Sequence, residues 1–156
     1  MPATSYTPKF EEPVKDTSIR HVSEYMARKV IAFSPEMNMY DAIQILLKNK
    51  IAGGPVVDKN GKMLGVLSEN DCLRLLTLET YHSMPNHEVQ HYMSTNVRTI
   101  DSDASVVDAA EKFRKEGLRR LPVLHNGILV GQISRRDCLR AIIDQKHQQE
   151  RELGGK

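Results

Sequence analysis

The chain contains an internal duplication, and this feature constrains its fold more than any other. The stretch VSEYMARKVIAFSPEMNMYDA, from Val22, aligns without a gap with VQHYMSTNVRTIDSDASVVDA, from Val89. After the loss of one residue in a turn, GVLSENDCLR (65–74) aligns with GQISRRDCLR (131–140). A unit of this size buries too little apolar surface to be stable alone, so we expect the two copies to pack together.

Each copy has the pattern strand, helix, strand, strand, helix. Apolar residues at helical spacing predict the first helix, at Met39, Ala42, Ile43, Leu46 and Leu47 in one copy and at Val106, Ala109, Ala110 and Phe113, before Gly117, in the other. Apolar runs joined by Asn-Gly predict a hairpin in each copy, in PVVDKNGKMLGVLS and PVLHNGILVGQIS. The last helix has its apolar residues at Cys72, Leu73, Leu75 and Leu76, and at Cys138, Leu139, Ile142 and Ile143. The predicted fold class is therefore α/β (α+β), with two tandem β-α-β-β-α motifs.

The composition excludes some classes of protein. The 156 residues carry a net charge of +2, far below the strongly basic balance of proteins that bind nucleic acid through phosphate contacts. No window approaches the roughly 20 apolar residues of a membrane span, and residues 1–19 contain no signal-peptide core. We therefore expect a cytoplasmic location, with neither a membrane nor a nucleic acid as partner.

The duplication also divides the chain. We expect an N-terminal arm over residues 1–19, a first domain over 20–79, a connection over 80–88, a second domain over 89–144 and a polar tail over 145–156. The tail is predicted to be the frayed, solvated end of a helix, because it is polar and ends in glycines.

The repeated Ser-x-x-Asp element, in GVLSEND and GQISRRD, allows two interpretations. It is a helix-capping pattern, in which the Ser oxygen accepts a backbone N–H and the acid complements the positive end of the helix. The same helix start suits a ligand, because free amides attract phosphate and a carboxylate accepts hydrogen bonds from both ribose hydroxyls. The two interpretations are compatible, and the spacing does not choose between them.

The cysteines and histidines indicate packing rather than chemistry. Cys72 and Cys138 occupy equivalent positions on apolar helix faces, so we expect buried thiols and no disulfide. His82, His87 and His91 cluster between the copies, but they have no partner Cys and no firm helical register. A zinc site is therefore not expected.

Residues typical of catalysis are also missing from the sequence. It contains no phosphate-binding loop, no C-x-x-C and no recognisable Ser/His/Asp set, and Asp41 and Asp108 are predicted to be exposed acids in the first turns of helices. We therefore expect no enzyme activity, no metal and no required cofactor.

Taken together, the repeated motifs resemble a tandem pair of cystathionine-β-synthase (CBS) domains, also called a Bateman module, over roughly residues 20–144. The resemblance rests on YM before the first strand, SPEMNMYDA at the first helix, PVVD and LPVL at the second strand, and the G-x-φ-S-x-x-D element, where φ is apolar. It implies a pseudo-twofold unit with two clefts, dimerisation into a flat disc, and binding of adenosine-containing ligands.

The resemblance further implies two unequal clefts, in which the hydroxyl and the Asp of the Ser-x-x-Asp element contact phosphate and ribose. Cleft A would combine Ala32, Gly53, Gly54 and Pro55 with Ser134, Arg135, Arg136 and Asp137. Cleft B would combine Thr99, Arg120, Leu121 and Pro122 with Ser68, Glu69, Asn70 and Asp71.

The two clefts differ in charge and in hydroxyl groups. Ala32 lacks the hydroxyl of a Thr common at that position in the family, whereas Glu69 places a negative charge where phosphate would bind. Phosphate contacts are expected from two of the four arginines Arg119, Arg120, Arg135 and Arg136. We therefore expect cleft A to bind phosphate-bearing ligands more tightly than cleft B.

The function expected from the resemblance is that of a free-standing, bacterial-type regulatory sensor. It would bind AMP, ADP or ATP, with S-adenosylmethionine and NAD as open alternatives, and signal to an unknown protein partner as a homodimer. A structural adaptor or dimerisation module with empty clefts is the competing hypothesis, and a small hydrolase or other nucleotide-processing enzyme is a third. Ligand-dependent melting distinguishes the sensor from the adaptor.

Overall fold

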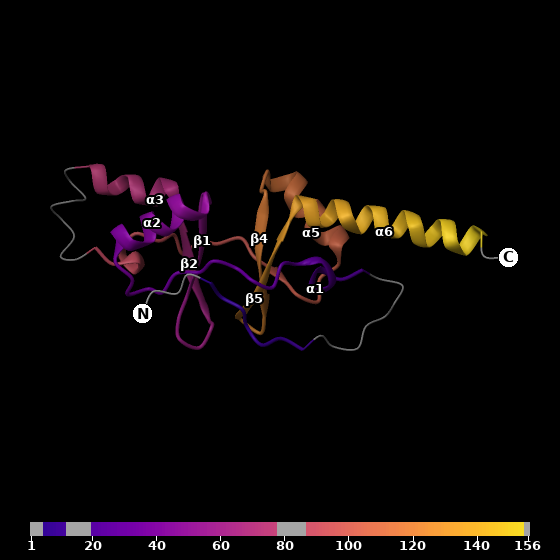
Figure 1. Ribbon diagram of the computed structural model, residues 1–156, viewed down its shortest axis with the longest axis horizontal. Coiled ribbons are helices and arrows are strands. Elements are labelled where there is room, and N and C mark those ends of the chain that lie inside the picture. Colours follow the sequence, from indigo (N-terminus) through magenta and orange to yellow (C-terminus); the bar gives the residue numbers. More distant parts are fainter. Residues whose placement is uncertain (1–4, 12–19, 78–86, 155–156) are drawn as a thin grey trace. The chain divides into compact units, whose positions relative to one another are not determined.

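The computed structural model describes residues 5–11, 20–77 and 87–154 (Figure 1). These residues form two compact units. Unit 1 contains residues 5–8, 29–77, 87–98 and 126–129, and unit 2 contains residues 9–11, 20–28, 99–125 and 130–154. The units do not coincide with the sequence copies, because the segment that leads each copy belongs to the unit built mainly from the other copy.

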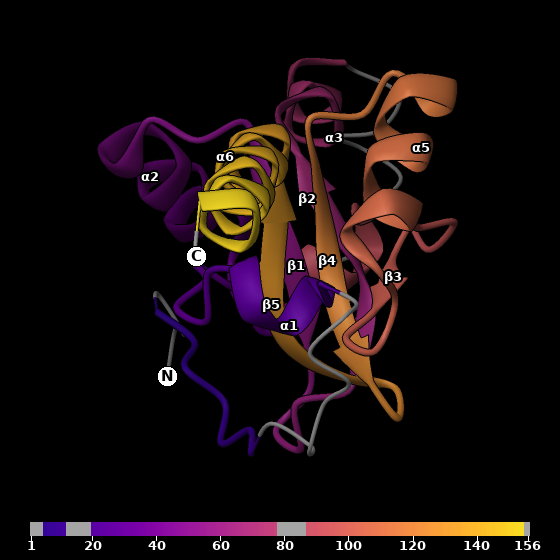
Figure 2. The same cartoon turned by 90° about the vertical axis from the view of Figure 1, so that its right-hand side faces the viewer.

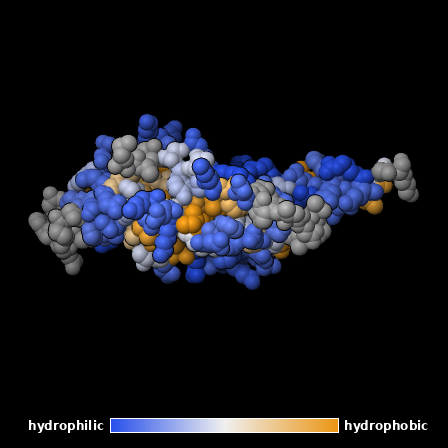
Figure 3. Space-filling model, turned by 90° about the horizontal axis from the view of Figure 1, so that it is seen from below, coloured by the Kyte–Doolittle hydropathy of each residue, from blue (hydrophilic) through white to orange (hydrophobic). Residues whose placement is uncertain are grey.

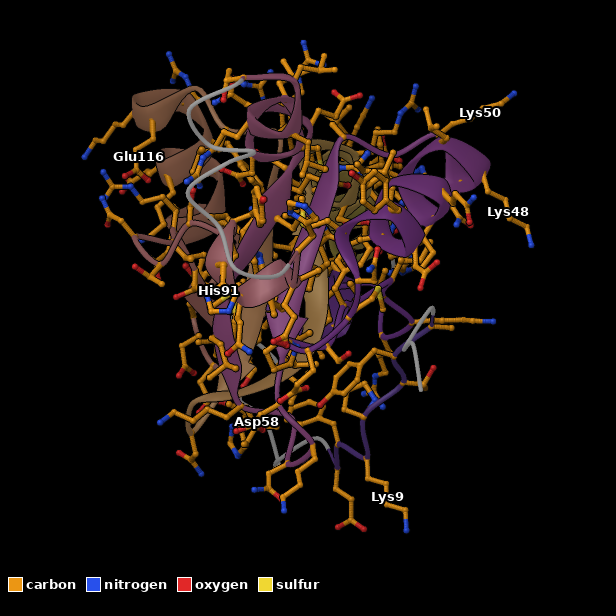
Figure 4. The ribbon with its side chains drawn as sticks, turned by 90° about the vertical axis from the view of Figure 1, so that its left-hand side faces the viewer. Lys9, Lys48, Lys50, Asp58, His91 and Glu116 are labelled. Atoms are coloured by element: carbon orange, nitrogen blue, oxygen red, sulfur yellow. The ribbon has the colours of Figure 1, made fainter. Side chains whose placement is uncertain are left out.

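Unit 1 is built on an antiparallel hairpin of β1 (Gly53–Val57) and β2 (Met63–Ser68). The predicted Asn-Gly turn joins these strands, and Asp58 lies at this turn (Figure 4). The Asp58 carboxylate accepts the backbone N–H groups of Asn60 (2.8 Å) and Lys62 (3.0 Å), which fixes the turn. The core contains residues of the hairpin, of α2 (Met39–Asn49) and of the 3₁₀ helix η2 (Val89–His91), and includes Phe33, Met39, Ala42, Leu46, Val56, Leu67, Val89 and Tyr92.

The buried face of α2 differs from the prediction at one edge. Met39, Ala42 and Leu46 are buried as predicted, but Leu47 is 73% exposed and Ile45 is buried. Successive helical residues are about 100° apart, so Ile45 lies about 60° around the helix from Ala42, whereas Leu47 lies about 140° from it and outside the buried arc. The helix ends in solvent, where Lys48 and Lys50 point outward in Figure 4.

Unit 2 contains β3 (Ile100–Asp101), β4 (Arg120–His125) and most of β5 (Ile128–Ser134). β3 is parallel to β4, and the turn between β4 and β5 has the predicted positive φ at Asn126 (51°) and Gly127 (80°). α5 (Val106–Glu116) and α6 (Arg135–Gly154) contact each other, and both pack on this sheet (Figure 2). The core includes Val22, Met26, Ile100, Ala109, Phe113, Leu121, Val123, Val130, Ile133 and Cys138.

The helix α6 is longer than predicted and buries a different face. It continues to Gly154, so the polar tail is helical rather than frayed, and its outer part is mostly hydrophilic in Figure 3. Cys138 and Ala141 face the core, because these small side chains let the helix approach the sheet. The larger residues predicted to share that face are instead exposed, namely Leu139 (58%), Ile142 (59%) and Ile143 (51%).

The corresponding segment of unit 1 is short. α3 (Glu69–Leu73) is followed by the 3₁₀ helix η1 (Arg74–Leu76), and both Leu73 and Leu76 are exposed. A helix therefore begins at both predicted positions, but fewer of its apolar residues are buried than the sequence pattern predicted.

Each unit closes the edge of its hairpin with a segment of the other copy. In unit 1, Ser94 and Val66 exchange two backbone hydrogen bonds of 2.9 Å. In unit 2, Ala27 and Gln132 exchange two of 2.8 and 2.9 Å. The short helix α1 (Val22–Tyr25) precedes Ala27, as η2 precedes Ser94. The two copies are therefore interleaved, and neither forms a complete unit by itself.

The glycines of the repeated element permit this close pairing. A Cβ added at Gly131 would lie 2.7 Å from the carbonyl oxygen of Ala27 and 2.7 Å from the sulfur of Met26. A Cβ added at Gly65 would lie 2.5 Å from the carbonyl oxygen of Ser94. The segment that begins with the YM dipeptide of one copy thus contacts the backbone at the glycine of the other copy, and only glycine leaves room for this contact.

The predicted mixture of helices and sheets is confirmed, but one predicted strand is shorter than expected. The first strand of the first copy is limited to a single parallel bridge between Phe33 and Val56. Pro35 follows closely and has no N–H to donate, which prevents a longer ladder. Within the described residues, no helix combines the length and apolarity needed to cross a membrane.

Candidate functional site

The first Ser-x-x-Asp element forms a capping box at the start of α3. The Ser68 hydroxyl accepts the Asp71 N–H (3.2 Å), and Asp71 Oδ2 accepts both the backbone N–H and the hydroxyl of Ser68 (2.9 Å each). Asp71 is only 8% exposed, so this carboxylate is held inside the unit by these bonds.

The second element has the same geometry at the start of α6. The Asp137 N–H donates to the Ser134 hydroxyl (3.3 Å), and Asp137 Oδ2 accepts the Ser134 N–H (2.7 Å) and hydroxyl (3.0 Å). Asp137 is 7% exposed. The capping interpretation is therefore confirmed in both copies.

At both helix starts, protein acceptors already take two of the first three amides that a phosphate could use. The Arg135 N–H donates to the carbonyl oxygen of Arg119 (3.2 Å), and the Asp137 N–H is taken by Ser134. Of the first three amides of α6, only that of Arg136 has no protein acceptor among the described residues. Any anion bound there must be held mainly by side chains.

The two carboxylates differ at their second oxygen. Asp71 Oδ1 accepts the Ser94 hydroxyl (3.3 Å), whereas Asp137 Oδ1 accepts the Arg140 guanidinium in a close ion pair. The residue equivalent to Arg140 is Arg74, which instead lies over the Tyr92 ring at 5.3 Å and donates to the Tyr92 carbonyl oxygen (3.4 Å). Asp137 is thus neutralised by a cation and Asp71 is held by a hydroxyl.

A pocket of about 440 Å³ in unit 2 surrounds the second element. It is lined by four arginines together with small and polar residues, namely Arg119, Arg120, Arg135, Arg136, Ala27, Gln132, Ser134 and Asp137. Its one acid is already paired with Arg140, so the pocket carries a large excess of positive charge.

The arginines of this pocket are available to a ligand to different degrees. The Arg135 Nε donates to the Leu118 carbonyl oxygen (2.7 Å), which orients its guanidinium toward the start of β4. The side chains of Arg119, Arg120 and Arg136 are exposed and make no ion pair with the described residues. Such groups bind phosphate oxygens through short, charge-assisted hydrogen bonds.

A comparison with models of known protein families identifies the family of this chain. The CBS domain model matches residues 22–78 and again residues 89–144. The chain belongs to the CBS domain family. The resemblance found in the sequence motifs is confirmed.

This CBS pair is similar to proteins from plants, amoebae and bacteria. The crystal structure of CBSX2 of Arabidopsis thaliana in complex with AMP has a TM-score of 0.71 and 27% identity, over 81% of this chain and 98% of that chain. A CBS domain-containing protein of Dictyostelium discoideum is 30% identical over 132 residues, which cover 78% of this chain and 90% of that protein. The A-adding tRNA nucleotidyltransferase of Aquifex aeolicus is 28% identical over 121 residues, but these cover only 14% of that enzyme.

The other predicted site residues of the first CBS motif lie close to the Ser68 element. Gly53 pairs with Ser68 across the β1–β2 hairpin, and an added Cβ at Gly53 would lie 2.6 Å from the Leu67 carbonyl oxygen. Ala32 and Pro55 are buried, and Gly54 approaches the Phe33 ring. Close packing therefore explains why glycine occupies positions 53 and 54, in addition to any role toward a ligand.

In the second CBS motif, Leu121 is fully buried in the core, so its side chain does not face a ligand. Thr99 and Pro122 are half-buried, and the Thr99 carbonyl oxygen accepts the Lys112 ammonium (3.3 Å). Unit 2 brings Arg120, which the sequence assigned to cleft B, into one pocket with Arg135 and Arg136, which it assigned to cleft A.

The combination of half-sites into clefts A and B stays a prediction, because each cleft takes its residues from both units. Sequence reasoning missed Arg140 and Ser94 as partners of the two carboxylates. Arg140 had a detectable signal, since it follows Asp137 by three positions on a helix, where opposite charges meet. Ser94 had none, because its position depends on the interleaving of the copies.

The cysteines of the CBS pair are packing residues. Cys138 is buried, and Cys72 is half-buried against the core of unit 1. Burial, followed by the nearby charges of Asp71 and Glu69, raises the pKa of Cys72 to about 11. Burial and the charge of Asp137 also raise the pKa of Cys138. Both thiols are therefore protonated and unreactive at neutral pH.

The two described histidines of this cluster, His87 and His91, have protein partners. The His87 Nδ1 lies 2.7 Å from the Tyr92 hydroxyl, and the His91 Nε2 lies 3.9 Å from a Glu88 oxygen. His82 lies outside the described residues. Among residues 5–11, 20–77 and 87–154, no three metal-ligating side chains are grouped as for a metal ion.

Proposed function

We propose that this CBS pair is a non-catalytic regulatory module that binds an adenosine-containing ligand and signals to a protein partner. The observation that carries the proposal is the pocket at the start of α6, where a buried carboxylate lies beside several arginines. The similarity to CBSX2, whose crystal structure contains AMP, supports the same class of ligand.

The chemistry of the pocket suits a nucleotide. Asp137 is a carboxylate with four lone-pair directions, of which the capping box and Arg140 use three. A ribose hydroxyl takes the remaining direction, or takes the place of Arg140. The exposed guanidinium groups of Arg120 and Arg136 then hold the phosphate.

A thermal-shift panel tests the proposal. AMP, ADP, ATP, S-adenosylmethionine and NAD are compared as ligands, and at 100 times its Kd a ligand stabilises the folded form by about 2.7 kcal/mol. This corresponds to a rise in Tm of roughly 5–10 °C for a chain of this size. No rise with any of these ligands at millimolar concentration contradicts the proposal.

Two matched variants locate the binding. Asp137→Asn keeps an acceptor oxygen for the capping box but removes the charge, and we expect it to reduce the shift. Asp108→Asn makes the same change in the capping box of Ser105 at the start of α5, outside the pocket, and should leave the shift unchanged. Calorimetry should also show Asp137→Ala weakening the tightest binding event more than Asp71→Ala.

The module is proposed to leave its ligand unchanged. The carboxylates at the two helix starts are used in capping boxes, and the two thiols are protonated at neutral pH. ATP or AMP incubated with the protein for hours should therefore be recovered intact by chromatography. Conversion that disappears in Asp137→Ala would reveal an enzyme instead.

One observation favours the second candidate, a structural adaptor. Leu139, Ile142 and Ile143 are exposed on α6, and such an apolar group is typical of a contact surface. An adaptor that keeps this surface but has no small ligand would show no ligand-dependent change in Tm. The thermal-shift panel therefore separates the two candidates.

A further inference from the structure

The two Ser-x-x-Asp elements are equivalent in backbone geometry but opposite in charge. The Glu69 N–H donates to the Ala52 carbonyl oxygen (2.8 Å) in unit 1, as the Arg135 N–H donates to that of Arg119 (3.2 Å) in unit 2. Because this hydrogen bond occurs in both units, it identifies which residues of unit 1 are structurally equivalent to which residues of unit 2. The four positions are Ala52, Gly53, Glu69 and Asn70 in unit 1, and Arg119, Arg120, Arg135 and Arg136 in unit 2.

The four unit 2 positions carry four positive charges, whereas the four unit 1 positions carry a single negative charge. Opposite charges favour ligands of different charge at the two places, because a phosphate chain is attracted by the arginines and repelled by Glu69. A single phosphate has three terminal oxygens, which one or two guanidinium groups satisfy. The remaining exposed arginines of the pocket contact the ligand only if it has further phosphates.

We infer that the unit 2 pocket selects ligands by the length of their phosphate chain, and prefers a nucleoside triphosphate to a monophosphate. The inference rests on the proposed function for the adenosine part of the ligand, and the arginines add a separate preference for polyphosphate. The equivalent position in unit 1 does not discriminate in this way, because Glu69 and Asn70 replace the two helix-start arginines.

The position of the pocket supports this assignment. Arg119 precedes β4 and Arg120 begins it, whereas Arg135 and Arg136 begin α6, so residues of two elements line the pocket. The bond from Arg135 Nε to Leu118 fixes one guanidinium in advance. Exposure of the other three means that their attraction is screened by salt.

Calorimetry of the full chain, in buffer without divalent cations, tests the inference. The ligands are adenosine, AMP, ADP, ATP and inorganic tripolyphosphate. A charge-assisted hydrogen bond is worth about 1.5 kcal/mol or more when unscreened, or roughly tenfold in affinity. We expect affinity to rise about three- to tenfold with each phosphate at low salt, and this gradient to shrink at high salt. Tripolyphosphate alone should compete with ATP.

Variants identify the residues responsible. The double substitution Arg120→Gln and Arg136→Gln should flatten the gradient from AMP to ATP while adenosine binding persists. Arg114→Gln changes an exposed arginine of α5 outside the pocket and should leave the gradient intact. Glu69→Arg with Asn70→Arg should introduce phosphate dependence at the unit 1 element. The native chain and each variant are compared by circular dichroism to confirm folding.

The outcomes separate the two proposals. Equal affinity for AMP and ATP, or a gradient that survives in the Arg120/Arg136 double variant, overturns the inference and leaves the proposed function standing. Binding of tripolyphosphate without any binding of adenosine, AMP, ADP or ATP supports an anion pocket and overturns the preference for a nucleoside triphosphate. Absence of binding by all five compounds overturns the inference, and the proposed function then depends on S-adenosylmethionine and NAD in the thermal-shift panel.

Discussion

At the scale of single residues, the two buried carboxylates have a structural role, and we propose that Asp137 also binds the ligand. Asp71 and Asp137 are almost fully buried, and each satisfies the backbone N–H of the Ser three positions earlier. The Ser-x-x-Asp spacing was sufficient to predict these capping boxes, because the bonds are local. It did not predict that Arg119 would occupy an amide of the second helix start, since that bond joins residues far apart in the sequence.

The capping role of Ser134 can be measured as stability. Ser134→Ala removes the acceptor for the Asp137 N–H and should lower the free energy of unfolding by about 1 kcal/mol, within the usual range of roughly 0.5–2. Urea denaturation provides the measurement. Ser134→Thr keeps the hydroxyl and serves as the control, so an equal loss in both variants would contradict a capping role.

The environment of Cys72 predicts slow alkylation. Its pKa of about 11, against an ordinary value of 9.0, lowers the thiolate fraction at pH 8 about a hundredfold. A more basic thiolate is more nucleophilic, which offsets part of this effect and leaves a rate roughly tenfold below that of a model thiol. Iodoacetamide labelling of a Cys138→Ser variant, followed from pH 8 to 11, should show the rate rising throughout. A rate that is half-maximal near pH 9, as the ordinary pKa of 9.0 requires, would contradict the raised pKa.

At the scale of secondary structure, local sequence patterns predicted where helices and turns occur better than which face of each helix is buried. The Asn-Gly turns and Gly117 mark true chain reversals and a true helix end, because these depend on positive φ at single residues. The apolar residues of α6 gave the helix but not its buried side. Leu139 and Ile142 are exposed because the core takes the small Cys138 and Ala141 instead, and apolarity alone does not encode this choice.

Because the segments of the two copies pair so closely, adding one methyl group at the contact should strongly reduce stability. Gly131→Ala places a Cβ 2.7 Å from the Ala27 carbonyl oxygen, so the β5 edge must shift, and we expect a loss of about 1–3 kcal/mol in unfolding free energy. Thermal or urea denaturation measures the loss. Gly154→Ala, at the end of α6 with no atom within 4 Å of the added Cβ, is the control and should be neutral. A neutral Gly131→Ala would show that the close approach is not rigid.

At the scale of the whole chain, the duplication predicted the family and the repeated motifs, but not which segments pack in which unit. The predicted domains 20–79 and 89–144 each include their own YM segment, whereas Ala27 pairs with Gln132 and Ser94 with Val66. This exchange depends on long-range packing, which periodicity does not report. The gathering of four arginines in one pocket depends instead on pairing within the second copy, where the Arg135 N–H donates to the Arg119 carbonyl oxygen.

The exposed apolar residues of α6 bear on assembly, which we continue to predict as a homodimer. Ile142→Glu combined with Ile143→Glu should lower the molar mass measured by light scattering from that of a dimer to that of a monomer, because charges replace apolar contact surface. Leu153→Glu, at the outer end of α6, is the control. A native chain that is monomeric at tens of micromolar contradicts the prediction.

Hydrogen exchange of the full chain, with and without saturating ATP, tests the central claim most directly, because it reports where the ligand binds. We expect slower exchange over residues 118–122 and 132–140, which include the start of β4 and the Ser134–Asp137 element, and no change over residues 146–153 at the outer end of α6. Unchanged exchange over 132–140 at an ATP concentration shown to saturate the protein would contradict this claim.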